Sequence, residues 1–433
     1  MSTDYTFVRR FFSGLVGNIR HNLQPAQPMP EDLRQNFFHL MMDIGGYGVL
    51  NATALTFLNI YATRIHAGTE QIGILNAIPA LMTMLLSLPA GPYLEKRSLT
   101  KTSIVLGILH RSYYMLLVLL PFILNEKLQV NLLIALTFIM YIPYSAFALA
   151  FNSLFSAAVP PEWRGYFAGA RNALFAVVTI LMALLSGYLL EVLPFPIGYQ
   201  VVFGLGFIGA MVSTYHIARI RVPENVRANS IEANRGRERL SLIDQVRKSL
   251  RIDILHGPFL RVLILLTIFH FCHYLPSSIF PVFMVNNLHL TDQTISVGTS
   301  LFYVTMFIGS LQHSRIVNRF GNRWVVGIGM VLMATYPATL SLATGPALYL
   351  VANILGGFAW SLCGTALFNY LLESVPVESR PSYLAWFSVL ANFGVLAGSL
   401  LGPVVSNSVG IVTALVLAAV LRAASGAVIL RWG

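Results

Sequence analysis

Twelve mainly apolar stretches, separated by short polar gaps, constrain the fold of this chain more than any other feature. A run of about 20 apolar residues is the length at which a helix crosses the hydrocarbon of a bilayer. The stretches lie at 37–62, 71–93, 102–124, 130–157, 166–190, 199–219, 260–286, 294–317, 324–343, 346–373, 382–407 and 410–431. We therefore expect an all-α membrane protein with twelve transmembrane helices.

The composition agrees with lipid as the solvent for most of the chain. Charged residues make up 10% of the 433 positions and hydrophobic residues 56%, whereas soluble domains carry about 25% charged residues. The net charge of +11 does not indicate a nucleic-acid-binding protein, because the basic residues fall mostly in the gaps between apolar stretches. Both cysteines lie inside apolar stretches, so we expect no structural disulfide.

The distribution of Lys and Arg predicts the orientation. Alternate gaps hold only Arg64 and Lys127, while the others hold Lys96, Arg97, Lys101, Arg164, Arg171, the basic 219–261 region, Arg319, Arg323 and Arg380. Basic residues are enriched in cytoplasmic loops. We expect a multi-pass protein of the cell membrane with both termini in the cytoplasm.

The longest gap divides the twelve stretches six and six. The expected organisation is a cytoplasmic amphipathic segment (1–36), an N-terminal six-helix bundle (37–219), a cytoplasmic linker (220–259) and a C-terminal six-helix bundle (260–433). Within the linker, apolar residues recur at helical spacing from Leu240 to Ile254, opposite basic residues. That pattern predicts a helix on the membrane surface, although a solvated connector remains an alternative.

An internal repeat indicates that the two bundles are related. The sequence Val-Pro-x-Glu-x-Arg occurs at 159–164 and again at 375–380, and Phe-Asn-x-Leu occurs shortly before each copy. Two pseudo-symmetric halves are typical of duplicated transporter folds. The residues of this inner-end repeat are Asn152, Glu162, Arg164, Asn369, Glu378 and Arg380. Asn152 and Asn369 are candidates for a hydrogen bond between the halves.

A second motif follows the second stretch of each half, at 91–97 and 314–323. It resembles the short cytoplasmic motif of the major facilitator superfamily, and the six-plus-six plan extends that resemblance over the whole chain. The resemblance implies a gating role for Gly91, Glu95, Lys96, Arg97, Asn318, Arg319, Gly321 and Arg323. It further implies that Glu95 docks at the start of stretch 11; Ser98 and Asn318 depart from the motif and predict a weaker latch.

The same resemblance implies that stretches 1, 4, 7 and 10 line a central cavity. Candidate substrate or coupling residues in and near these stretches are Asp43, Tyr47, Asn51, Arg111, Tyr144, His270, His273, Tyr274 and Trp360. Asp43 is the one carboxylate clearly inside a stretch. An intramembrane charge is costly and often functional, so Asp43 is either a proton or cation site or a structural ion-pair partner, for which Arg111 is the candidate.

His270 and His273 could relay protons or simply pack by hydrogen bonding. No second ligand cluster accompanies them, so we expect no metal site. Gly394, Gly398 and Gly402 stand four residues apart in stretch 11, which predicts close helix packing.

These features predict a secondary active transporter that moves a small solute by alternating access. Proton-coupled efflux is favoured by the aromatic cavity with its single acid, and uptake of a sugar or metabolite is the alternative. A receptor or interaction protein on a transporter fold is the alternative of another class. No catalytic motif is present, and we expect no enzyme activity, no cofactor, no nucleic-acid partner and a monomer.

Overall fold

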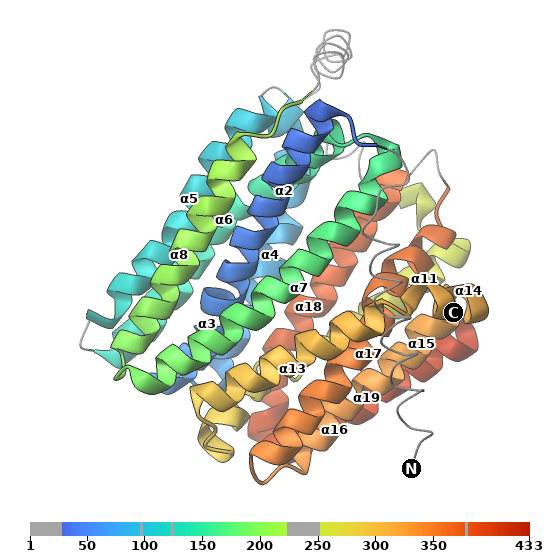
Figure 1. The fold of residues 1–433 in the computed structure, drawn as a ribbon. Coiled ribbons are helices and arrows are strands. Elements are labelled where there is room, and N and C mark those ends of the chain that lie inside the picture. The colour runs from blue at the N-terminus through green and yellow to red at the C-terminus, as the bar shows by residue number, and fades with distance from the viewer. Residues whose placement is uncertain (1–27, 96–97, 123–124, 223–251, 377–379) are drawn as a thin grey trace, which may run out of the picture.

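A computed structural model of the protein describes residues 28–95, 98–122, 125–222, 252–376 and 380–433, and these residues contain helices but no strand. Figure 1 shows two bundles side by side. The N-terminal half comprises α2 (Glu31–Leu50), η1 (Asn51–Leu55), α3 (Thr56–Arg64), α4 (Thr69–Glu95), α5 (Leu99–Leu119), η2 (Leu120–Phe122), α6 (Glu126–Ala158), α7 (Pro161–Val192) and α8 (Ile197–Ala218). The C-terminal half comprises η3 (Ile252–Ile254), α11 (Gly257–Tyr274), α12 (Ile279–Val282), η4 (Phe283–Asn287), α13 (Asp292–Ser310), α14 (His313–Phe320), α15 (Asn322–Met333), α16 (Thr335–Ser341), α17 (Pro346–Glu373), α18 (Arg380–Val409) and α19 (Ile411–Trp432).

Every predicted stretch has a helical counterpart. Ten helical segments of the described chain are long and apolar enough to cross a membrane, and α13 with α14, bent by 54°, forms an eleventh. The remaining stretch is the continuous helical segment α2–η1–α3, which contains Asp43 and the polar residues Asn51 and Asn59. The all-α membrane fold is confirmed, and the expected twelve spans are consistent with it.

The most extensive packing between the halves is that of α4 against α18 and of α7 against α13. Glycines permit both approaches. The Cα of Gly73 lies against the Ser399 carbonyl on α18, and that of Gly187 lies against Ser296 on α13. We call the end at which α2 begins, α8 ends and α11 begins the linker end, and the opposite end the hairpin end.

Two of the helical spans contain π-helical segments. The first contains a π-helical segment at Asn51–Leu55. The seventh breaks after Tyr274, where Pro276 lacks an N–H donor, and resumes as α12 and the π-helical η4. Because such breaks depend on neighbouring helices that satisfy the freed carbonyls, hydropathy alone did not reveal them.

The glycines of α18 pack as predicted. A methyl group added to Gly394, Gly398 or Gly402 would meet the backbone of α11 at Thr267, Phe271 and Leu275, respectively. The absence of a side chain therefore lets α18 lie directly on the backbone of α11.

The predicted surface segments are only partly described. Residues 1–27 and 223–251 lie outside the described residues, and with them most of both predicted amphipathic segments. Within the described part, α2 begins at Glu31 rather than at 37, and Ile252–Ile254, the described part of the predicted linker helix, form a 3₁₀ turn.

Candidate functional site

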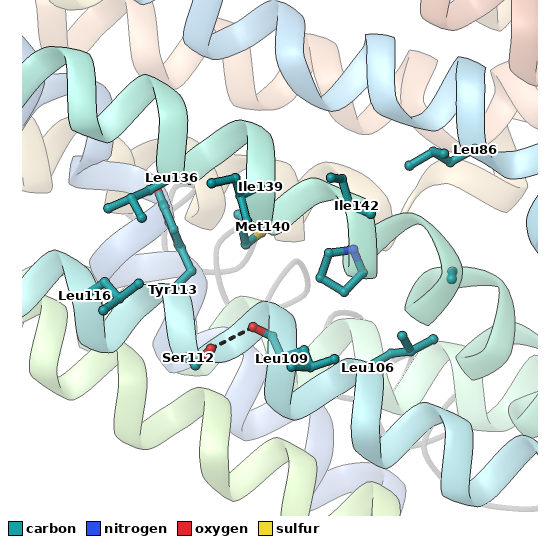
Figure 2. Close-up of a pocket in the computed structure, with 12 residues that line it drawn as sticks. Leu86, Leu106, Leu109, Ser112, Tyr113, Leu116, Leu136, Ile139, Met140 and Ile142 are labelled. Carbon is teal, nitrogen blue, oxygen red and sulfur yellow. Dashed lines mark hydrogen bonds between the residues drawn. The ribbon is translucent and has the colours of Figure 1, made fainter.

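One cavity is an apolar groove on the outside of the N-terminal half. It encloses about 720 Å³ between α4, α5 and α6, and Figure 2 shows leucine and isoleucine side chains around it. Its serine, Ser112, already donates to the carbonyl of Leu109 at 2.7 Å. Leu109 and Ile139 are 55% and 60% exposed, so this groove faces the lipid and offers no group for recognising a polar solute.

A second, smaller cavity is lined by charged residues. It encloses about 270 Å³ inside the N-terminal half and is lined by Asp43, Ile44, Tyr47, His110, Arg111, Tyr144, Phe147, Ala148, Phe151, Asn152, Arg171 and Ile217. We call it the Asp43 pocket. Five of the predicted site residues lie in it: Asp43, Tyr47, Arg111, Tyr144 and Asn152.

Asp43 is buried, with 3% of its surface exposed, and both of its oxygens are bonded. Arg171 on α7 donates through Nη1 to Oδ2 at 2.8 Å, and the Ser213 hydroxyl on α8 donates to Oδ1 at 2.5 Å. The same Arg171 nitrogen donates to the Leu40 carbonyl at 2.9 Å. Asp43 therefore forms the buried ion pair that the sequence left open.

The partner of that ion pair differs from the expected one. Arg111 does not contact Asp43 directly: it donates to the Ser213 hydroxyl at 2.8 Å, to the Ala210 carbonyl at 3.1 Å and to the Thr214 hydroxyl. Ser213 thus links the second guanidinium to the carboxylate. Arg171 takes the direct position because α7 packs against α2, a contact that no local pattern encodes.

Aromatic rings form the walls of the pocket. The His110 ring lies 5.1 Å from both the Tyr144 and Phe147 rings, and the Arg111 guanidinium carbon lies 5.0 Å from the Phe147 centroid. Phe151 stands 5.4 Å from the Arg171 guanidinium carbon. A guanidinium over an aromatic face gains cation–π energy where water is excluded, so the walls hold both cations in place.

The candidates on α11 and α17 form a separate cluster in the C-terminal half. His273 stacks on Trp360 at 5.3 Å and on Tyr274 edge-to-face at 5.2 Å. His270 bonds through Nδ1 to the Leu266 carbonyl at 2.7 Å. Stretches 7 and 10 therefore contact each other, but none of these four residues lines the Asp43 pocket.

Contacts between the halves gather toward the hairpin end. Among the described residues, every hydrogen bond between the halves lies in the middle of the helices or at that end. Asn51 donates to the Tyr303 hydroxyl at 2.9 Å, and Arg64 bonds both the Leu290 carbonyl at 2.6 Å and the Asp292 carboxylate at 3.0 Å. This conformation is therefore closed at the hairpin end.

The second copy of the gating motif holds the linker end of the C-terminal half. Arg323 donates to the carbonyls of Ile429 and Leu430 at the end of α19, at 3.3 and 2.6 Å. Gly321, with φ of +79°, turns the chain between α14 and α15, and Arg319 lies over the ring of its neighbour Phe320. Asn318 lies on α14 and has no hydrogen bond in the described part of the chain.

The side chains of the first copy of the gating motif, at 91–97, lie outside the described part of the structure. Lys96 and Arg97 lie outside the described residues, and Gly91 and Glu95 are placed only as part of the α4 backbone. The expected docking of Glu95 against α18 therefore stays a prediction.

The inner-end repeat has a structural component at Arg164, which bonds the Val159 and Ser156 carbonyls at the end of α6. Glu162 is exposed in the first turn of α7. No hydrogen bond joins Asn152 to Asn369, both of which are exposed in this conformation. Glu378 lies outside the described residues, as does the Arg380 side chain.

Sequence reasoning missed three polar residues of the site: Arg171 and His110, which line the pocket, and Ser213, which bonds Asp43. The position of Arg171 was a signal that it could belong to the site, because it lies ten residues after the start of α7. The distribution of basic residues instead grouped it with the charges of the gaps. Ser213 and His110 offered none, since their roles come from packing between helices. In the described part of the chain no three His, Cys, Asp or Glu side chains gather as metal ligands.

Comparison with known proteins places the chain among membrane transporters. The family model described as Major Facilitator Superfamily matches residues 40–291 and 262–433. A crystal structure of a variant of the nucleoside transporter NupG superposes with a TM-score of 0.66 at 14% identity, covering 92% of this chain and 99% of the other.

Two curated relatives match over shorter segments. Multidrug resistance protein 1 of Bacillus subtilis (strain 168) is 21% identical over 119 residues, which are 28% of this chain and 31% of that protein. Sugar transport protein 4 of Arabidopsis thaliana is 27% identical over 110 residues, 25% of this chain and 21% of that protein. Each match spans less than a third of the relative.

Proposed function

Since the chain belongs to the Major Facilitator Superfamily and is a transporter of that type, we propose that it couples the movement of a small solute to protons, with Asp43 as the proton site. The pairing of Asp43 with Arg171 carries this proposal. An acid inside a transmembrane bundle is costly and marks proton or substrate pathways. Asp43 lines a cavity and is paired there with Arg171, and this ion pair can break when Asp43 takes a proton.

Alternating access supplies the transport cycle in this proposal. The halves rock about a central site, as in other transporters with repeated bundles. The Arg64–Asp292 pair and the Asn51–Tyr303 bond hold the hairpin end closed in the observed conformation. The basic residues near the linker end favour a cytoplasmic position for that end, so the conformation corresponds to an inward-facing state of a cell-membrane protein.

The charges of the Asp43 pocket do not favour export over uptake. The sequence favours export of an apolar or amphiphilic compound because the candidate cavity residues are aromatic and weakly charged, with a single buried acid. Two arginines share the pocket with it, which removes that reason. The relatives named multidrug resistance protein and sugar transport protein do not favour either direction, so the proposal rests on coupling rather than on export.

Transport by purified protein in proteoliposomes tests the proposal. We expect a solute found by a ligand-stabilisation screen to accumulate or leave in response to an imposed pH gradient, and Asp43→Asn to abolish the response to the gradient. Unchanged gradient-driven flux in Asp43→Asn would remove Asp43 as the proton site. Solute binding without any flux would favour a receptor on the same fold.

Accessibility labelling tests the orientation independently. Cysteines placed in the 223–251 segment should react with impermeant reagents only from the cytoplasmic side of intact cells. Reaction from outside would reverse the assignment of the linker end.

A further inference from the structure

The Asp43 pocket carries a surplus of positive charge that the proton site alone does not explain. Arg111 and Arg171 line it against the single carboxylate of Asp43, and its other lining residues are uncharged when His110 is neutral. The pocket therefore holds a net charge of about +1 within the low-dielectric bundle, where an unbalanced charge is expensive. An additional anion would offset that cost.

Both guanidinium groups also have unused hydrogen-bond donors. Arg171 bonds its protein partners in the described chain through Nη1 alone, and its side chain keeps 12% exposure on the pocket side. The Nε of Arg111 is buried without a partner. A buried donor without an acceptor costs free energy, and a carboxylate is the acceptor whose planar geometry matches a guanidinium.

The remaining lining selects the shape of the anion. Tyr144, Phe147 and Phe151 present flat apolar surfaces, and the volume of about 270 Å³ is small for a ligand pocket. We propose that the pocket binds a small organic anion with a planar apolar group, whose carboxylate takes Arg171 in competition with Asp43. This inference rests on the proposed transport function and specifies its substrate class.

The competition sets the sign of the coupling. When Asp43 is ionised it occupies Arg171; when it takes a proton it no longer neutralises the cation, and Arg171 becomes available to the substrate. Proton and anion therefore raise each other's affinity, as linkage requires, and both move in the same direction. The charged and titratable groups that face Asp43 are Arg171 on α7, Arg111 on α5, His216 on α8 and Tyr47 on α2.

Binding of three probes that share a phenyl ring and differ in charge tests the inference on the purified full-length protein. Benzoate, neutral benzamide and cationic benzylammonium are compared by thermal stabilisation and calorimetry at pH 5.5 and pH 8. We expect benzoate to bind, more tightly at the lower pH, and the other two to bind at least about tenfold more weakly, since they lack the charge-assisted bond.

Three variants locate the effect. Asp43→Asn should bind benzoate tightly at both pH values, because the competitor is gone. The double variant Asp43→Asn with Arg171→Gln, which leaves no unpaired buried acid, should fold yet lose benzoate binding by about tenfold or more. Arg34→Gln, at an exposed arginine of α2, should behave as the wild type.

Binding of benzamide or benzylammonium as tight as that of benzoate, benzoate binding that survives in the double variant, or no benzoate binding at millimolar concentration would each overturn the inference. Those results would leave proton-coupled transport standing if an imposed gradient still drives another solute. If the pocket binds benzoate selectively but transport does not respond to an imposed pH gradient, that result would instead count against the proposed function.

Discussion

Asp43 is stabilised by partners from two different helices, one charged and one neutral. The carboxylate receives bonds from Arg171 on α7 and Ser213 on α8. Ser213 in turn accepts from Arg111, so a change at one position alters the others. Such buried networks are favourable only while every member is satisfied.

Breaking the ion pair should therefore destabilise the protein more than removing it. We expect Arg171→Gln to lower the free energy of unfolding by about 3–5 kcal/mol, because it leaves Asp43 buried and unpaired. The double variant with Asp43→Asn should recover most of that loss. Denaturant or thermal unfolding in detergent checks the cycle; additive losses would show that the two side chains do not act as a pair.

The sequence identified the acid but not its partner. An isolated Asp in an apolar stretch is conspicuous because bilayer burial makes acids rare, and Asn51 and Tyr47 follow at helical spacing. Arg171 could not be assigned to it, since the choice between Arg171 and Arg111 depends on which helix packs against α2.

At the scale of the helices, the break in the seventh span has its own stabilising residue. The Ser277 N–H bonds the Tyr274 carbonyl rather than that of His273, which leaves the His273 carbonyl free. Arg422 on α19 donates to that carbonyl at 2.5 Å and to the Met333 carbonyl at 3.3 Å. With 2% exposure, Arg422 ties α19 to the end of α11.

Removing this arginine should loosen the break. We expect Arg422→Met to lower the free energy of unfolding by about 1.5–3 kcal/mol, the usual worth of a charged hydrogen bond, and to speed amide hydrogen exchange around 274–282. Arg431→Met, at an exposed arginine of the same helix, is the matched control. Equal effects of the two changes would deny Arg422 this role.

The number and order of the helices were predictable, because bilayer thickness imposes a length that hydropathy reveals. The π-helical segments and the break at 275–278 were not, since their freed backbone groups are satisfied by residues such as Arg422 that are far away in the sequence. The glycines of α18 lie between these cases: their spacing predicted packing, but only the structure shows α11 as the partner.

The contact between α7 and α13 gives a prediction about transport. Leu in place of Gly187 would collide with Ser296 on α13 and should prevent the hairpin ends from closing, reducing transport by about tenfold or more. Gly169 lies on the same helix with nothing within 4 Å of its position, so Gly169→Leu should transport normally. Comparable loss in both variants would point to a general effect on α7.

At the scale of the whole molecule, a small set of polar contacts closes one end. The Arg64–Asp292 pair is the only salt bridge between the halves among the described residues. Each residue is partly exposed, so the pair contributes a modest free energy. A modest contribution suits a gate, because transport requires both conformations to be populated.

Weakening this gate should shift the conformational equilibrium. We expect Asp292→Asn to raise the population open at the hairpin end several-fold, which corresponds to about 1 kcal/mol. The reactivity of a cysteine at Asn51, which lies inward of the gate, measures that population from the hairpin side. The comparison protein carries the same cysteine with Asp292 intact, because the cysteine removes the Asn51–Tyr303 bond in both proteins. Equal reactivity in the two would show that the pair does not hold the end closed.

Distances between spin labels at the two ends test alternating access most directly. One pair joins Glu191 on α7 to Gln293 on α13 at the hairpin end; the other joins Gly165 on α7 to Arg319 on α14 at the linker end, both in a background lacking the two buried cysteines. Two halves that rock against each other predict that the first distance lengthens whenever the second shortens, as pH or ligand is varied. Distances that change together, or a linker-end distance that never shortens, would contradict the account.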